Sequence, residues 1–203
     1  MAARLHTLAA LLALLPLGGV QARSDLGASL AICLLSPAAD PPALGVVRAI
    51  TPVATPTIFA RGLFAEIRLE DRGKVLWSQQ ASGPQPVEGP LAWPLPPLRP
   101  GQTLLLRLRP LGVEENAFAD VEVTGASAAT LARTAALVHS LGSDPKAWQR
   151  AVVTELDAGR TAVALALLYD FHGPASEDLN TLRREVHDQA CDSAILGRET
   201  PPR

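Results

Sequence analysis

Apolar and polar residues alternate in the middle of the chain, which is the pattern of a strand with one face in a core. In residues 63–70 every odd-numbered position is apolar, and the even-numbered positions hold Phe64 and three charged residues. Because successive side chains of a strand point to opposite faces, this pattern predicts one apolar and one mostly charged face. A turn at Asp71-Arg72-Gly73 then leads into a return strand over residues 74–78. The segment is therefore expected to be a β-hairpin.

A second alternating segment follows the turn Pro100-Gly101. In residues 102–109 the leucines at even-numbered positions share one face, and Leu105 stands on the opposite, polar face. Pro110 is expected to end this strand, because proline has no amide hydrogen to give to a sheet. Comparable patterns predict two further strands, at residues 44–53 and 118–124.

The last third of the chain has a different period. Apolar residues recur every three to four positions there, which is typical of helices. Asp144 and Pro145 predict a helix start, because aspartate caps free amides and proline suits the first helical position. Glycines separate four predicted helices. The third, Thr161 to Phe171, is apolar nearly all round and is expected to be the most buried.

Three segments of the chain together resemble a known architecture. They are Ile67–Asp71, Val75–Ser78 and Leu95–Leu108, and they look like the middle of a fibronectin type III or immunoglobulin-like sandwich. In such domains a Leu-x-Pro-Gly step leads into a long late strand, as Leu98-Arg99-Pro100-Gly101 does here. Thr103 or Leu104 stands where these domains usually carry a tyrosine. The chain is also similar to uncharacterised secreted proteins, mostly from cyanobacteria, that join such a sandwich to a helical tail, and this resemblance implies no activity.

These patterns predict an α+β protein. An N-terminal antiparallel β-sandwich is expected over residues 24–124, followed by C-terminal helical hairpins over residues 127–197. Residues 198–203 are expected to form a loose tail.

Residues 1–22 have the features of a secretory signal peptide. Arg4 provides a positive start, and the apolar run from Leu8 to Leu15 is too short to cross a bilayer. Ala22 offers a small residue before a cut. Cleavage near Ala22 would place the protein in the periplasm or outside the cell, whereas a retained membrane anchor is the alternative. No later segment is expected to span a membrane.

Cys33 and Cys191 are the only two cysteines of the chain. Outside the cytoplasm an even count favours a disulfide, which here would join the first strand to the last helix. The alternatives are two buried free thiols, or a lipid attached to Cys33. Lipid attachment is disfavoured because Ile32 is larger than the residue that normally precedes a lipidated cysteine.

Composition narrows the kinds of partner. The chain of 203 residues is 48% hydrophobic and carries a formal net charge of −2, which fits a packed core. Aromatic residues make up only 4%, and no basic run occurs. A nucleic-acid partner is therefore not expected, because stacking on bases and attraction to phosphates need more of both.

The sequence predicts no catalytic, metal or cofactor-binding residue. His187 and Cys191 lie four positions apart on a predicted helix, but two ligands do not make a metal site. No nucleophile elbow, CxxC pair or phosphate-binding glycine loop is present. The charged positions of the alternating strands, such as Glu66 and Glu70, are expected to line a solvated face rather than to act as acid and base.

A contact surface is the remaining hypothesis. Phe64, Leu76 and Leu105 stand on the predicted polar face, where they would form an apolar patch unless a helix covers them. Trp77 and Trp93 would extend it as surface rings, although a lone tryptophan in a sandwich more often belongs to the core.

The sequence therefore predicts a secreted or periplasmic, non-catalytic binding or scaffold protein with a protein partner. One alternative is an extracytoplasmic hydrolase that gathers His139, His172 or His187 against a carboxylate. The other is a carbohydrate-binding module that holds a glycan on Trp77 or Trp93.

Overall fold

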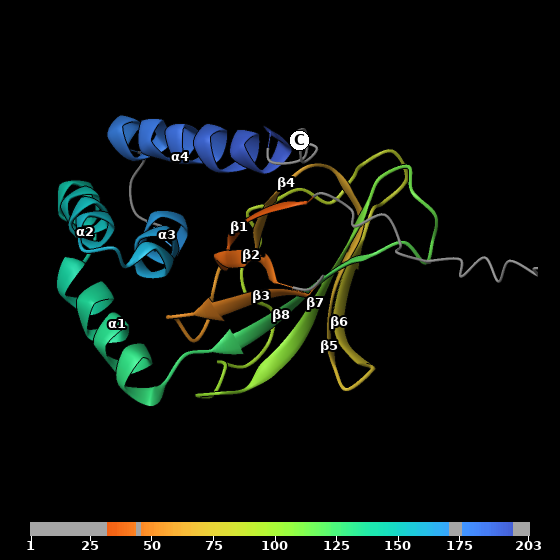
Figure 1. The fold of residues 1–203 in the computed structure, drawn as a ribbon, viewed down its shortest axis with the longest axis horizontal. Helices are drawn as coiled ribbons and strands as arrows, with labels where there is room; N and C mark the ends of the chain where they lie inside the picture. The colour runs from red at the N-terminus through yellow and green to blue at the C-terminus, as the bar shows by residue number, and fades with distance from the viewer. Residues whose placement is uncertain (1–31, 44–45, 171–175, 197–203) are drawn as a thin grey trace, which may run out of the picture.

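The computed structural model describes residues 32–43, 46–170 and 176–196 (Figure 1). Within these ranges eight strands precede four helices, so the protein belongs to the α+β class, as predicted. The strands are β1 (Cys33–Ser36), β2 (Ala39–Ala43), β3 (Val46–Thr51), β4 (Phe59–Arg61), β5 (Phe64–Asp71), β6 (Lys74–Gln80), β7 (Thr103–Pro110) and β8 (Ala119–Gly125). The helices are α1 (Ala128–Leu141), α2 (Pro145–Asp157), α3 (Thr161–Asp170) and α4 (Glu177–Leu196).

The strands form a large mixed sheet and a small one. The large sheet has the order β2-β3-β8-β7-β5-β6, and β1 pairs with β4 in the small sheet. β3 and β8 run parallel, whereas the sequence predicted antiparallel pairing throughout. Alternation within a strand reports which face is buried but not which neighbour the strand pairs with, so the parallel pair left no trace in the pattern.

The inner face of the large sheet carries the core. Leu106 of β7 lies opposite Leu69 of β5 on one side and Val121 of β8 on the other. Leu69 and Leu106 have no exposed surface, and Val121 is 4% exposed. The predicted apolar faces of β7 and β8 are therefore confirmed.

Phe64 lies in this core, which corrects the prediction that it stands on the polar face. Its side chain is 1% exposed, whereas the neighbouring Leu63 is 49% exposed. The register between β5 and β7 shifts between Phe64 and Glu66, which marks a β-bulge. A bulge inserts one unpaired residue and reverses the alternation before it, so Phe64 points inward together with Ile67.

Helix α2 begins where its capping signal predicts. The Asp144 carboxylate accepts a hydrogen bond of 3.0 Å from the Lys146 N–H, with Pro145 in the first turn of α2. α3 is the most buried helix, and Leu167 and Leu168 have no exposed surface. Figure 1 shows the helices gathered at one side of the large sheet, with α4 running past β1 and β4.

Three contacts tie the helices to the strands. Leu35 of β1 is 1% exposed and packs in the core of the helical region. The Thr57 N–H donates a 3.1 Å hydrogen bond to Asp170 at the end of α3. Cys33 and Cys191 form a disulfide between β1 and α4, with their Cα atoms 5.5 Å apart. The small sheet therefore contributes to the core of the helices and is joined to them by a covalent bond.

Some predictions concern residues beyond those that the structure describes. The signal peptide at residues 1–22 and the tail at residues 198–203 lie outside the described ranges. Among the helices that are described, none is both long enough and apolar enough to cross a membrane.

Candidate functional site

The predicted contact residues do not assemble into one patch. Phe64 belongs to the core, and Leu105 stands half-buried on the outer face of the sheet between Glu70 and Glu122. Leu76 is 42% exposed, but the β5–β6 register passes from Trp77 to Val75 and skips it. This bulge turns Leu76 away from Leu105.

The two predicted surface tryptophans are half-buried. Trp77 lies opposite Leu69 in the sheet, and Trp77 and Trp93 both pack against the sheet core. The Trp93 indole N–H donates a 3.2 Å hydrogen bond to the Pro96 carbonyl. Both rings therefore border the core and expose only part of their surface.

The exposed edge of the large sheet is β6. It is the last strand in the sheet order, and six of its seven residues are exposed. The Ala81 N–H donates to the Ala65 carbonyl at 2.9 Å, so these two residues form a hydrogen-bonded pair. Along an antiparallel ladder, hydrogen-bonded pairs alternate with pairs whose backbone groups point away from each other. By that alternation Ser78 and Gln80 turn their backbone N–H and C=O groups away from β5. These groups are available to pair with another strand.

The opposite edge of the sheet is protected by its sequence. β2 contains Pro41 and Pro42, which have no amide hydrogen, and proline is a common means of blocking a sheet edge. β6 contains no proline, and its one charged residue, Lys74, lies at its first position. Of the two edges, β6 is therefore the one suited to strand pairing.

A shallow groove lies beside β6. It has a volume of about 340 Å³ and is mostly aliphatic. We refer to it as the leucine–proline groove; it is lined by Leu76, Leu95, Pro96, Pro97, Arg99, Gln102 and Leu104. An apolar side chain from a segment paired with β6 would be within reach of this groove.

The outer face of the sheet carries charges that neutralise one another. Glu66 and Glu70 are 8% and 5% exposed, although the sequence predicted a solvated face. The reason is that long arginine side chains cover them, one from β5 itself and one from the neighbouring β7. Arg68 lies 2.6 Å from Glu70, and Arg109 lies 3.3 Å from Glu66.

The ring of Phe118 packs against arginines of the same cluster. The guanidinium carbons of Arg68, Arg107 and Arg109 lie 4.1, 4.8 and 5.8 Å from the centre of its ring. Such distances are typical of cation–π contacts. With Asp120 bonded to Arg107 at 2.7 Å, three carboxylates face three guanidinium groups. This cluster therefore has no surplus charge with which to attract a polyanion.

The two histidines that the structure describes, His139 and His187, do not meet in a cleft against a shared carboxylate. His139 is exposed in the last turn of α1. His187 contacts the Oδ1 of its own neighbour Asp188 at 3.0 Å on the surface of α4. His172 lies outside the described residues. Within the described ranges no three histidine, cysteine or acidic side chains gather as a metal site would require.

Comparison with known proteins finds no matching family model, no matching curated protein and no matching solved structure.

The free backbone of Ser78 and Gln80 was not predicted from the sequence. The sequence predicted the hairpin of β5 and β6. The strand order across the sheet, however, decides which of these two strands lies at the edge. A usable signal was present in the return strand, because residues 74–80 lack proline and carry a single charge, unlike a protected edge.

Proposed function

We propose that this protein is an extracytoplasmic, non-catalytic binding protein that accepts an extended segment of a protein partner along β6. The observation that carries the proposal is the outward-facing backbone of Ser78 and Gln80 on an exposed edge beside the leucine–proline groove. In strand addition the backbone hydrogen bonds supply affinity, and pockets for alternate side chains supply specificity.

The edge defines the chemistry of the partner. The bound segment must be extended, so that its own N–H and C=O groups meet those of Ser78 and Gln80. One of its apolar side chains would enter the leucine–proline groove. Lys74, exposed at the start of β6, favours an acidic residue at the matching end of the segment.

The disulfide supports a location outside the cytoplasm. Disulfides form and persist in oxidising compartments and are rare in the cytosol. Cys33 and Cys191 are bonded, and the expected signal peptide at residues 1–22 would deliver the chain to such a compartment. The proposal therefore places the partner in the periplasm or outside the cell.

The sheet order supports the resemblance to an immunoglobulin-like sandwich. Counting inward from the edge strand, the order β6-β5-β7-β8 corresponds to C′-C-F-G of variable-type immunoglobulin sheets. The small β1–β4 sheet would then be the remnant of the second layer. We further propose that the four helices correspond to the helical tail of the secreted proteins that join such a sandwich to helices.

The test is capture of a partner from the native host with the mature protein and the variant Ser78→Pro. The Ser78 N–H points away from β5, so proline removes the outward donor and spares the ladder. The partner recovered by the unchanged protein after mild cross-linking should fall by about tenfold or more with the variant.

Ser78→Ala is the matched control, because it keeps the backbone N–H and should recover the partner in full. A partner that binds Ser78→Pro equally well would exclude the β6 edge. Failure to recover any recurrent protein at several cross-linker lengths would exclude the binding function. If the partner proves to be a second copy of the chain, the proposal of a foreign partner is wrong.

A further inference from the structure

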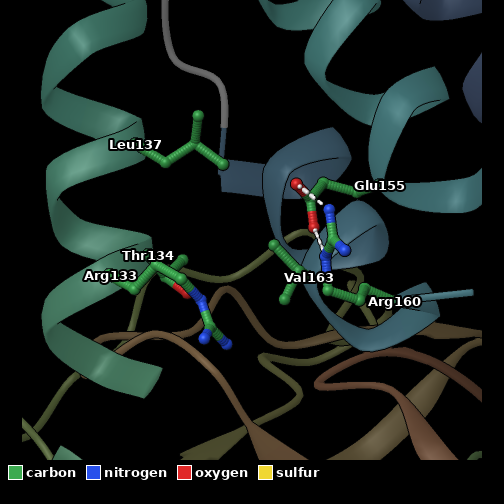
Figure 2. Close-up of a pocket in the computed structure, with 6 residues that line it drawn as sticks. All are labelled: Arg133, Thr134, Leu137, Glu155, Arg160 and Val163. Carbon is green, nitrogen blue, oxygen red and sulfur yellow. Dashed lines mark hydrogen bonds and ion pairs between the residues drawn. The ribbon is translucent and has the colours of Figure 1, made fainter. Parts of the chain in front are cut away.

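A pocket in the helical region (Figure 2) contains one buried polar atom, the Thr134 hydroxyl oxygen, that has no partner among the described residues. It lies between α1 and the turn that joins α2 to α3, far along the chain from β6. The pocket has a volume of about 280 Å³, just below the usual range for sites of drug-sized ligands. Its lining residues are Arg133, Thr134, Leu137, Glu155, Arg160 and Val163.

Thr134 is the first indication of a ligand. Its side chain is 1% exposed, and its hydroxyl has no hydrogen-bond partner among the described residues. Buried hydroxyl groups are normally hydrogen-bonded, because leaving water without a new partner is costly. A ligand atom in the pocket that accepts a hydrogen bond would satisfy this group.

Glu155 and Arg160 satisfy each other. The Arg160 Nε and Nη2 donate to the two carboxylate oxygens of Glu155 at 2.5 and 2.9 Å. This hydrogen bonding holds the pKa of Glu155 below its ordinary value. The pair therefore presents a fixed, neutral wall at one side of the pocket, as Figure 2 shows.

Arg133 supplies the surplus charge. It extends from α1 beside the pocket, and its positive charge also helps to lower the pKa of Glu155, although no hydrogen bond joins Arg133 to another described residue. Two guanidinium groups and one carboxylate leave the pocket with one uncompensated positive charge. Such a charge beside a buried hydroxyl favours a ligand with one negative charge.

The apolar side chains of the pocket indicate which kind of anion would fit it. Leu137 lies on the α1 side of the pocket with Thr134, and Val163 lies on the opposite side beside Arg160. Inorganic phosphate would leave these walls uncovered, whereas an aliphatic chain would pack against them.

We propose that this pocket binds a short aliphatic carboxylate. Its carboxylate group would accept hydrogen bonds from Arg133 and Thr134, and its alkyl chain would lie against Leu137 and Val163. This site goes beyond the proposed function, since it shares no residue with β6 and does not depend on a protein partner.

The test is isothermal titration of the full mature protein with hexanoate. Binding is expected with a dissociation constant of about 1 mM or tighter. Hexanamide, which has the same chain without the charge, should bind about tenfold more weakly because a charge-assisted hydrogen bond is lost. Equal affinity for the two compounds, or tighter binding of inorganic phosphate, would overturn the proposal.

Two variants assign the site. Thr134→Val keeps the shape of the side chain but removes the hydroxyl, and Arg133→Gln removes an exposed charge. Each should weaken hexanoate binding by about tenfold. Arg184→Gln is the matched control, since Arg184 is an exposed arginine of α4 that bonds only to Thr181 among the described residues.

Thermal unfolding of each variant checks that it is folded. Because the Thr134 hydroxyl has no protein partner to lose, Thr134→Val should melt no lower than the unchanged protein. Hexanoate binding that survives both pocket variants, or no binding at concentrations well above the expected dissociation constant, would exclude the site.

Discussion

Tyr169 shows how a single buried polar group can limit the pH range of the protein. It is the only tyrosine of the chain. Its ring packs against Phe59 with the ring centres 4.9 Å apart, and its hydroxyl has no partner in the described structure. Burial raises the pKa of Tyr169 from 10.0 to about 12, and the nearby charge of Arg183 only partly opposes this. Ionisation of the ring therefore favours the unfolded state.

The corresponding prediction concerns alkaline stability. The folded-state pKa of Tyr169 is raised, so the stability it contributes is complete below pH 10 and is lost as the pH rises towards 12. At pH 11 the loss should be about 1 kcal/mol in the free energy of unfolding. Tyr169→Phe should abolish this loss and leave stability at pH 7 unchanged, because no hydrogen bond is removed.

Two measurements check this prediction. Urea unfolding at pH 8 and pH 11 compares the two proteins, and tyrosinate absorbance reports the ionisation directly, since no other tyrosine contributes. A tyrosinate transition centred near pH 10 in the folded protein would contradict it.

At the scale of elements, the sequence predicts which segments are strands and helices better than it predicts how they pair. The core face of β7 and the start of α2 at Asp144 follow from local chemistry, namely alternation and capping. Phe64 and Leu76 were misplaced because each adjoins a bulge, and a bulge reverses alternation without leaving a distinct residue type.

The sites were harder to predict than the elements. The outward backbone of Ser78 depends on sheet order, which is a property of the whole fold. The pocket did leave one local sign, because Thr134 interrupts an inward helical stripe between Leu131 and Val138. A polar residue in such a stripe indicates a buried group that needs a partner.

A prediction at this scale concerns the end of β8. Gly125 packs so closely that an added Cβ atom would lie 2.5 Å from the Arg99 carbonyl oxygen. Because the contact is with backbone, Gly125→Ala must move a strand or a turn, and it should destabilise the protein by about 1–3 kcal/mol. Equilibrium urea unfolding measures the change.

Gly101→Ala is an informative comparison. The added methyl group there meets nothing within 4 Å, and only the positive φ of 71° opposes it. Its cost should be about 1 kcal/mol, from backbone strain alone. Gly125→Ala with unchanged stability would contradict the close approach of β8 to Arg99.

At the scale of the whole molecule, β1 joins the two regions that the sequence separates at residue 124. Leu35 of this strand packs among the helices, and Cys33 bonds to α4. The sheet and the helices are therefore expected to unfold together.

The double variant Cys33→Ala with Cys191→Ala tests whether the sheet and the helices unfold together. The two cysteines are 158 positions apart, and on the chain-entropy model closing such a loop stabilises the protein by about 5 kcal/mol. The variant should lose stability of that order in urea unfolding, in a single transition reported equally by circular dichroism and tryptophan fluorescence. Two separate transitions, or free thiols in the unchanged protein after alkylation under denaturing conditions, would contradict the coupling.

The position of the disulfide also determines how the molecule would bear mechanical load. Tension applied to chain segments on the two sides of Cys33 and Cys191 passes directly through the sulfur–sulfur bond. The large sheet, the β6 edge and the pocket lie within the bridged loop, so a pull of this kind does not stretch them. Reduction of the disulfide would let the same tension reach the bridged loop, which could then extend by up to about 3.6 Å per residue. The proposed binding edge on β6 would therefore keep its shape under such tension as long as the disulfide is intact.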